Sequence, residues 1–305
     1  HQGTDAPFVN GGEVKNVGVE LSLAYSDKIG EFNYTVRANA AMLENTLENL
    51  DGYNNSGIDF VSHDDYQVRD DLRPYRSTVG EALRSHYLVP YVSVFQSQAE
   101  INNYANDGVL IQPNAVPGDL KFQDTDNDGD IDNDDRVYHG SYQPDLTYSF
   151  NFSANYKGFD ASLILQGVAG VEAFNGYKYA AYNASLQGYN LDSRVLDAWT
   201  ASNTNTGIPR ISTTDNNNNF GTQSTWYLED ASYLRFKNVT FGYSFPNYVM
   251  DSLLNGSSLR VYVSAENLFT ITDYTGIDPE VGGIGLDVAQ YPLSRAISAG
   301  LSLKL

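Results

Sequence analysis

Apolar and polar residues alternate one by one along seven segments of this chain. The last segment shows the pattern most simply: polar residues or glycine separate Ile297, Ala299, Leu301, Leu303 and Leu305. Because successive side chains of a β-strand point to opposite faces, a period of two predicts one apolar wall and one polar wall. The alternation predicts strands near 15–26, 31–42, 145–156, 158–168, 232–245, 258–267 and 294–305.

The connections between these segments alternate between short and long. The short ones are 27–30, 157–158 and 246–257, and the long ones are 44–144, 170–231 and 267–292. Consecutive antiparallel strands place their connections at opposite ends, so the short turns share one rim and the long loops share the other. This asymmetry is typical of an outer-membrane β-barrel, with short periplasmic turns and long extracellular loops.

A soluble β-sandwich also has one apolar face per sheet. Its strands are usually about 5–6 residues long, whereas these segments alternate for about 9–12 residues, the length with which a tilted strand crosses the hydrocarbon. The pattern therefore favours an all-β, antiparallel transmembrane barrel facing outer-membrane lipid. Seven strands leave open edges that lipid does not tolerate, and the chain opens at His1 rather than Met. We expect it to be one arc of a larger barrel.

Composition narrows the classes of partner. Asp and Glu outnumber Lys and Arg 38 to 18, giving a net charge of −20, which argues against nucleic acid as a partner because phosphate binding needs a basic surface. The absence of cysteine excludes disulfides and cysteine-ligated metals. The chain has 23 tyrosines, and aromatic residues flank the short turns, where an interfacial girdle is expected.

The long loops contain some local patterns. Residues 97–106 and 191–201 are each predicted to form a short helix, the second with an apolar stripe that includes Val195, Leu196 and Trp199. We expect Trp199 to pack under the loop, and the four asparagines at 216–219 to form a polar loop tip.

One stretch has the spacing of a calcium loop. Residues 124–135 read DTDNDGDIDNDD, with glycine at the sixth position and Ile131 at the eighth. An EF-hand loop takes oxygen ligands from positions 1, 3, 5, 7, 9 and 12, with glycine at 6 for the sharp turn. The predicted ligands are Asp124, Asp126, Asp128, Asp130 (through its backbone carbonyl), Asp132 and Asp135.

The expected ion is structural Ca²⁺ that holds the long loop in place. Position 12 is Asp rather than the usual Glu. No long amphipathic helix enters the loop, and this argues against a conformational sensor. The alternative is a solvated acidic loop at the surface, which needs no ion.

Catalytic patterns are missing from the sequence. The four histidines (His1, His63, His86 and His139) are scattered, and neither GxSxG nor a phosphate-binding loop occurs. Carboxylate pairs are common in so acidic a chain and do not by themselves indicate a hydrolase. We therefore expect a protein that is not an enzyme.

Several stretches together resemble the SusC/RagA group of TonB-dependent outer-membrane transporters. They include PGDLKFQDTDNDGDIDNDDR at 117–136, PDLTYSFNFSANYKGFDASLILQGVAG at 144–170, YLEDASYLRFKNVTFGYSFP at 227–246 and LRVYVSAENLFTITDYTGIDPEV at 259–281. A further one is VNGGEVKNVGVELSLAY at 9–25, and the blocks follow one another through most of the chain.

This resemblance implies a 22-stranded barrel with a plugged lumen, of which residues 1–305 would be about the last seven strands. It further implies that an N-terminal plug and earlier strands lie outside this sequence. The receptor would couple to TonB through that missing part, and a SusD-like surface lipoprotein would act as its lid. The function it implies is import of oligosaccharides or oligopeptides across the bacterial outer membrane, and the calcium loop would then lie on the extracellular side.

Two other classes remain open at this stage. A secreted calcium-binding adhesin or scaffold module would be soluble without detergent and would form a closed domain within these residues. A surface glycan hydrolase would turn over its substrate.

Overall fold

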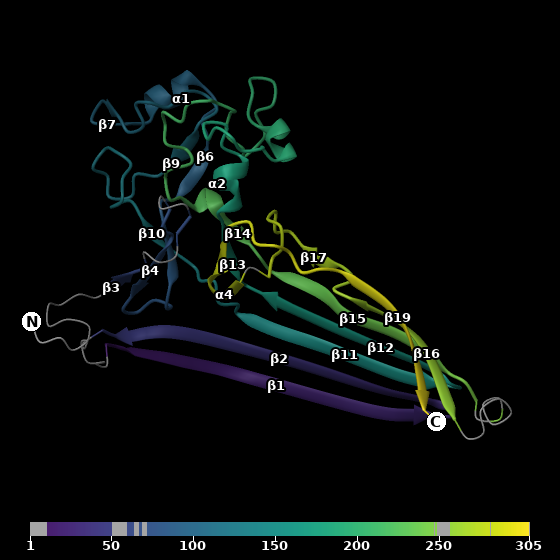
Figure 1. The fold of residues 1–305 in the computed structure, drawn as a ribbon. Helices are drawn as coiled ribbons and strands as arrows, with labels where there is room; N and C mark the ends of the chain where they lie inside the picture. Colours follow the sequence, from purple (N-terminus) through teal and green to yellow (C-terminus); the bar gives the residue numbers. More distant parts are fainter. Residues whose placement is uncertain are drawn as a thin grey trace, which may run out of the picture.

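In the computed structural model, a long antiparallel sheet makes up one part of the chain and a module of loops makes up the other (Figure 1). The structure describes residues 11–50, 60–63, 67–68, 72–246, 248, 257–280 and 282–304. The main sheet has the order β1-β2-β11-β12-β15-β16-β19, with short β17 continuing beside β15. Its strands are β1 (Glu13–Ile29), β2 (Phe32–Asn49), β11 (Leu146–Tyr156), β12 (Phe159–Ala169), β15 (Tyr233–Ser244), β16 (Ser258–Glu266), β17 (Thr270–Thr272) and β19 (Ala296–Lys304).

Each of the seven alternating segments coincides with one strand of this sheet, and the strands follow one another in chain order. The all-β, antiparallel expectation is confirmed. β2 runs farther than expected, to Asn49. Leu305 and most of the connection 246–257 lie outside the described residues. The turns after β1 and β11 lie together at one end of the sheet, and the long connections leave from the other (Figure 1).

The apolar side chains of neighbouring strands form continuous rows across the sheet. One row joins Tyr25, Val36, Phe152, Leu163, Val239, Ala265 and Ile297 through successive register pairs. A bulge between Ile164 and Leu165 on the β12–β15 pair skips Lys237, so Leu165 is opposite Phe236. The extra residue shifts the phase of β15 and keeps apolar side chains on one wall on both sides of the bulge.

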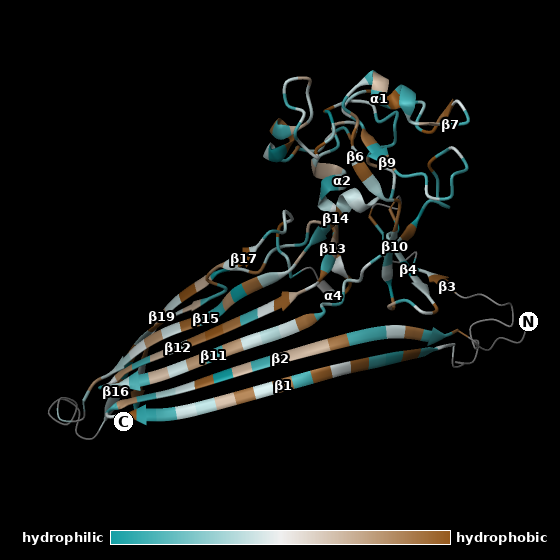
Figure 2. Ribbon diagram, turned by 180° about the vertical axis from the view of Figure 1, so that it is seen from behind, coloured by the Kyte–Doolittle hydropathy of each residue, from teal (hydrophilic) through white to brown (hydrophobic). Residues whose placement is uncertain are grey.

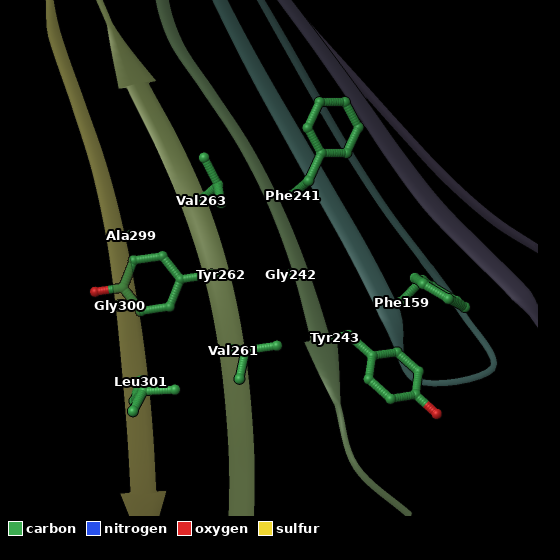
Figure 3. A pocket seen from close by; sticks show the side chains of 10 residues that line it. All are labelled: Phe159, Phe241, Gly242, Tyr243, Val261, Tyr262, Val263, Ala299, Gly300 and Leu301. Carbon is green, nitrogen blue, oxygen red and sulfur yellow. The ribbon is translucent and has the colours of Figure 1, made fainter.

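Aromatic rings gather at the short-turn end of this wall. Phe159 and Tyr243 are 4.6 Å apart between ring centroids, and Tyr243 and Phe245 are 5.2 Å apart. Phe32 meets Tyr156 at 6.4 Å. An apolar hollow of about 710 Å³ lies beside these rings. Figure 3 shows the residues of β12, β15, β16 and β19 that line it. The apolar residues of this wall are largely exposed in this chain. Figure 2 shows hydrophobic bands, coloured brown, along the long strands.

The opposite wall is polar and hydrogen-bonded across strands. Ser22 donates to Asn39, which donates to Ser149, and Thr240 contacts Ser264 at 2.8 Å. Near the short turns, Arg260 on β16 reaches across β15 to Asp160 on β12, with Nε 2.9 Å from Oδ1. The strand between them carries Gly242 at that point, and this absence of a side chain leaves room for the ion pair.

The three long connections fold together into one unit, which we call the loop module and define as the described residues of 60–142, 171–232 and 273–291. Its strands are β3 (Phe60–Ser62), β4 (Tyr75–Thr78), β5 (Ser85–Leu88), β6 (Tyr91–Val94), β7 (Ala105–Asn106), β8 (Val109–Leu110), β9 (Leu120–Phe122), β10 (Val137–His139), β13 (Glu172–Asn175), β14 (Leu228–Asp230) and β18 (Leu286–Asp287). Its helices are α1 (Gln98–Asn103), α2 (Tyr177–Ala181) and α4 (Gly282–Gly285), with 3₁₀ turns at Ser193–Asp197 and Thr225–Tyr227.

The main hydrophobic core lies in this module rather than in the long sheet. Leu88 from the first long connection, Phe174 and Tyr227 from the second, and Leu286 from the third belong to one buried cluster. Parallel pairing of β13 with β18 also joins the second and third connections. The module is therefore a packed body that none of the three loops forms alone.

The structure corrects two local predictions. The predicted helix at 191–201 is only a 3₁₀ turn, and Leu196, placed on its apolar stripe, is 84% exposed. The predicted asparagine tip at 216–219 is instead partly internal, because Asn219 is buried and its side chain accepts from the backbone N–H of Leu120. The predicted helix within 97–106 is confirmed as α1, capped by Ser97. No helix among the described residues is long and apolar enough to cross a membrane.

Candidate metal centre in the loop module

The acidic loop 124–135 connects two short strands at the edge of the loop module. It leaves β9 after Phe122 and enters β10 at Val137, and no helix flanks it within the described residues. Ile131, at the eighth position, packs against the module core as the sequence predicts. The hydroxyl of Tyr104, just after α1, accepts from the Asp124 backbone N–H and donates to the Phe122 carbonyl. The loop is thus anchored at its start and at its middle.

Three of the predicted ligands lie together. Asp124, Asp126 and Asp128 each offer a carboxylate oxygen, and these oxygens lie within 4.8 Å of one another. Asp124 accepts from the backbone N–H groups of Asn127, at 2.6 Å, and Gly129, at 3.1 Å. Gly129 has φ of +100°, a conformation that side chains rarely adopt, so glycine is required for the sharp turn.

The other three predicted ligands stand outside this group. Asp130 is exposed, and its backbone N–H donates to Asp128. Asp132 accepts from the N–H of Asp134. Asp135 is only 1% exposed, and its two oxygens accept from the N–H groups of Thr125 and Asp132. Asp135 therefore braces the two ends of the loop against each other.

The electrostatics of the loop are those of crowded, unneutralised carboxylates. Repulsion from Asp128 raises the pKa of Asp130. The hydrogen bond from the Asp128 backbone N–H lowers the pKa of Asp126, but desolvation and the neighbouring carboxylates outweigh it and leave that pKa raised. Among the ion pairs of the described residues, none joins a lysine or arginine to a carboxylate of this loop.

This donor set fits a hard cation. Ca²⁺ prefers six to eight oxygen ligands, supplied by carboxylates, carbonyls and water. The loop brings three carboxylates together and lacks histidine and cysteine, which suit softer metals. Asp124, Asp126 and Asp128 are the residues that would hold the ion.

Two tyrosines of the second long connection and Trp199 pack in or against the module core. Tyr179 and Tyr182, which could have stacked on a sugar ring, are buried in the module core. Trp199 packs against that core, and its Nε1 donates to Gln96 at 3.0 Å. Tyr189 is about half exposed.

Two buried ionic clusters were not predicted from the sequence. Arg235, at the module end of β15, pairs with Asp278 and Glu280 of the third connection. Asp119 is fully buried and pairs with Arg210, which joins the first connection to the second. Each pair is separated by more than 40 residues in sequence. No local spacing rule could have indicated them.

Comparisons with known proteins agree with this architecture. No protein-family model matches the chain. TonB-dependent receptor P3 of Formosa agariphila is 30% identical over 324 residues, which cover 100% of this chain and 30% of the receptor. TonB-dependent receptor SusC of Bacteroides thetaiotaomicron is 26% identical over 297 residues, covering 97% of this chain and 27% of SusC. The chain thus spans about 30% of the length of the first of these relatives.

Solved structures show the same fold. The RagAB peptide transporter matches with a TM-score of 0.71 and 25% identity, over 95% of this chain and 29% of that one. The RagAB peptide importer in the open-open state matches with a TM-score of 0.73 over 96% of this chain. These relatives are named as receptors and transporters, which confirms the expectation that the chain is not an enzyme. Over its whole length, and in both sequence and fold, the chain is thus similar to SusC/RagA-type TonB-dependent receptors, which are outer-membrane proteins.

Proposed function

We propose that this chain forms part of a TonB-dependent importer that carries oligosaccharides across the bacterial outer membrane. The observation that carries the proposal is the match of the whole chain, in sequence and in fold, to receptors and importers of this family. The two walls of the main sheet support it, because lipid suits the apolar wall and a wet lumen suits the hydrogen-bonded polar wall.

Oligopeptide import is the second candidate. The solved structures with the same fold are named as a peptide transporter and a peptide importer. The described residues include no catalytic constellation. Transport would therefore consist of capture, closure and release rather than chemistry on the substrate.

The barrel itself is part of the proposal. Among the described residues, β1 and β19 each pair with one neighbour in the main sheet and leave the other edge open. Open edges are not tolerated in lipid because backbone groups must be paired there. We infer that both edges pair with further strands of a 22-stranded barrel, the size that encloses a plug. A SusD-like lipoprotein would cover the mouth above the loop module, and TonB would act on the plug.

Deletion and complementation test the importer directly. A strain lacking the receptor should lose TonB-dependent uptake of its oligosaccharide, and the receptor should be extracted only with detergent, together with a surface lipoprotein. If the receptor were soluble without detergent and uptake unchanged, a secreted adhesin or scaffold would be the better assignment. Loss of peptide uptake alone would favour the second candidate.

We further propose that loop 124–135 binds a structural Ca²⁺ ion. Its support is the group of three carboxylates around a glycine turn. The affinity should resemble that of extracellular calcium modules, on the order of 10⁻⁴–10⁻³ M. The ion would stabilise the loop by neutralising carboxylates that lack a cationic partner among the described residues.

Calorimetry of the detergent-purified receptor with calcium chloride tests this site. Asp128→Ala should abolish the binding heat and the calcium-dependent gain in thermal stability. Asp134→Ala is the matched control, because Asp134 lies in the same loop at a position that supplies no ligand. The proposal fails if excess calcium gives no heat with the unmodified receptor, or if both variants behave alike.

A further inference from the structure

The small sheet β10-β5-β4-β3 of the loop module has two different faces. Tyr75 and His86 are register partners on the buried face. The other face carries Phe60, Arg76, Thr78, Tyr87, Arg136 and Tyr138, all of them partly exposed, and we call it the arginine face. Strand register brings its members together, because Phe60 is opposite Thr78 and Tyr87 is opposite Tyr138.

Both guanidinium groups of this face lie against the ring of Tyr87. The Arg76 Cζ atom lies 3.5 Å from the Phe60 ring centroid and 4.5 Å from that of Tyr87. The Arg136 Cζ atom lies 4.9 Å from the same Tyr87 ring. Tyr87 is itself 4.9 Å from Tyr138 between ring centroids. Stacking on aromatic faces orients arginine and limits the rotamer freedom it would lose on binding a ligand.

Arg76 and Arg136 lack a neutralising partner among the residues that the structure describes. Within the described part of the chain, no carboxylate forms an ion pair with Arg76 or Arg136, although acidic residues outnumber basic ones 38 to 18. Arg136 donates to the neutral side chains of Gln223 and Asn133. The Nε atoms of both arginines are buried without a hydrogen-bond partner in the described structure.

Two like charges held together, partly desolvated and unpaired, indicate a site for an anion that the protein does not itself supply. Guanidinium groups bind carboxylate and sulfate oxygens with paired donors. They offer no acceptor, so this face selects a ligand for its anionic groups. In the oligosaccharide import proposed above, such groups are the carboxylates or sulfates of acidic sugars.

We propose that the arginine face binds the carboxylate or sulfate groups of an acidic oligosaccharide, which makes acidic sugars the preferred substrate class of the importer. This inference rests on the proposed import function. Arg136 directly follows Asp135, the brace of the acidic loop, so the fold of that loop also positions one of the two arginines.

Binding to the detergent-purified receptor tests the proposal. The probes are oligogalacturonate with its carboxyl-reduced counterpart, and a sulfated galactan oligosaccharide with its desulfated counterpart. At least one charged probe should bind more tightly than its neutral counterpart. Arg76→Gln and Arg136→Gln should each weaken that binding about tenfold, the range of one charge-assisted hydrogen bond, while neutral counterparts are bound as before. Arg295→Gln is the charge-matched control, since Arg295 is exposed and lies outside this face.

A double variant with lysine at both positions distinguishes loss of binding from loss of folding. Arg76→Lys with Arg136→Lys keeps both charges but loses the paired donors, so affinity should fall part of the way while the receptor still assembles. The proposal is overturned if no charged probe is preferred, if charged and neutral probes weaken alike, or if arginine-dependent binding is found only for oligoglutamate. If deleting the receptor abolishes TonB-dependent uptake despite such a result, the import function stands. If deletion changes the uptake of no substrate, both proposals fail.

Discussion

At the scale of single residues, the structure depends on a few positions whose close surroundings restrict which residue fits. Gly242 and His86 are two of them, one on the polar wall of the sheet and one inside the loop module. Sequence alternation placed Gly242 on the correct face. It could not show that an ion pair crosses that glycine, because the partners come from strands 100 residues apart.

Replacing Gly242 should disrupt the Asp160–Arg260 pair. A Cβ atom at this position would lie 2.6 Å from both Arg260 Nη2 and Asp160 Oδ1, closer than real contacts allow. Gly242→Val should therefore displace the Arg260 and Asp160 side chains and lower stability by up to about 1 kcal/mol, the range of a partly exposed ion pair, because both clashing atoms lie at the ends of flexible side chains. Urea unfolding of the detergent-purified receptor measures this loss. Ser244→Val, two residues along the same wall, is the control and should change stability little.

His86 should make the loop module sensitive to acid. It is fully buried beside Tyr75 and opposite His139, and neither ring nitrogen has a hydrogen-bond partner in the described structure. Burial lowers its pKa from 6.5 to about 4, and the positive charge of His139 acts in the same direction against a raising backbone contact. The unfolded chain therefore binds a proton that the folded chain does not, so stability falls as pH drops from 6.5 towards 4.

The expected loss is on the order of 3 kcal/mol across that window. Amide hydrogen exchange in β5, measured at several pH values, should show faster opening at the acidic end. His86→Phe removes the titrating group and should flatten this dependence. A pH profile unchanged by the substitution would show that other groups, such as His139, govern the acid response.

At the scale of elements, ion pairs and short strands fix the long connections to the sheet. Arg235 on β15 is nearly fully buried, and its Nε donates to Thr270 of β17. Asp278 also accepts from the backbone N–H of Leu293, which brings the far end of the third connection into the same cluster. The cluster holds this connection against the rim of the sheet.

Removing Arg235 should release the third connection. Arg235→Met leaves Asp278 without its cation, whereas Glu280 keeps its contact with Lys237 at 3.4 Å. Removing one partner of a buried pair typically destabilises by about 3–5 kcal/mol, and we expect the lower end of that range because Asp278 still accepts backbone hydrogen bonds. Faster amide exchange at Glu280 and Leu293, with unchanged exchange at the centre of β15, would show local release. The exposed Arg295→Gln serves as control. Equal exchange in both variants would mean that β17 and β18 hold the connection without the cluster.

At the scale of the whole molecule, the chain divides its apolar residues between two environments. The module buries its apolar side chains in a core, while the long sheet leaves a wide apolar wall exposed. A soluble protein rarely exposes so continuous an apolar surface. The proposed lipid contact explains why the main core lies in the loops.

A matched pair of substitutions tests which wall faces lipid. Val263→Arg places a charge on the apolar wall, where Val263 is 52% exposed. Ser298→Arg places the same charge on the polar wall of the next strand, at nearly the same depth, since Ser298 is opposite Ser264. The first should destabilise the barrel by up to about 2–4 kcal/mol if it lies near the bilayer midplane, and the second by little. Folding titrations into liposomes measure the difference, and equal effects would contradict the assignment of the walls.

The sequence by itself determined the seven long strands, their faces and the acidic loop. These depend on periods of two or on fixed spacings within a dozen residues, so the local pattern is sufficient. It overstated the helix at 191–201 and misplaced the asparagines at 216–219, because their environments depend on packing against other connections.

Only the tertiary structure decided how the three long connections combine. The module core, the Arg235 cluster and the arginine face each join residues that are distant in sequence. Their partners are selected by chain topology and by the burial available once all three connections meet. That selection is a property of the assembled fold, and no periodicity along the chain encodes it.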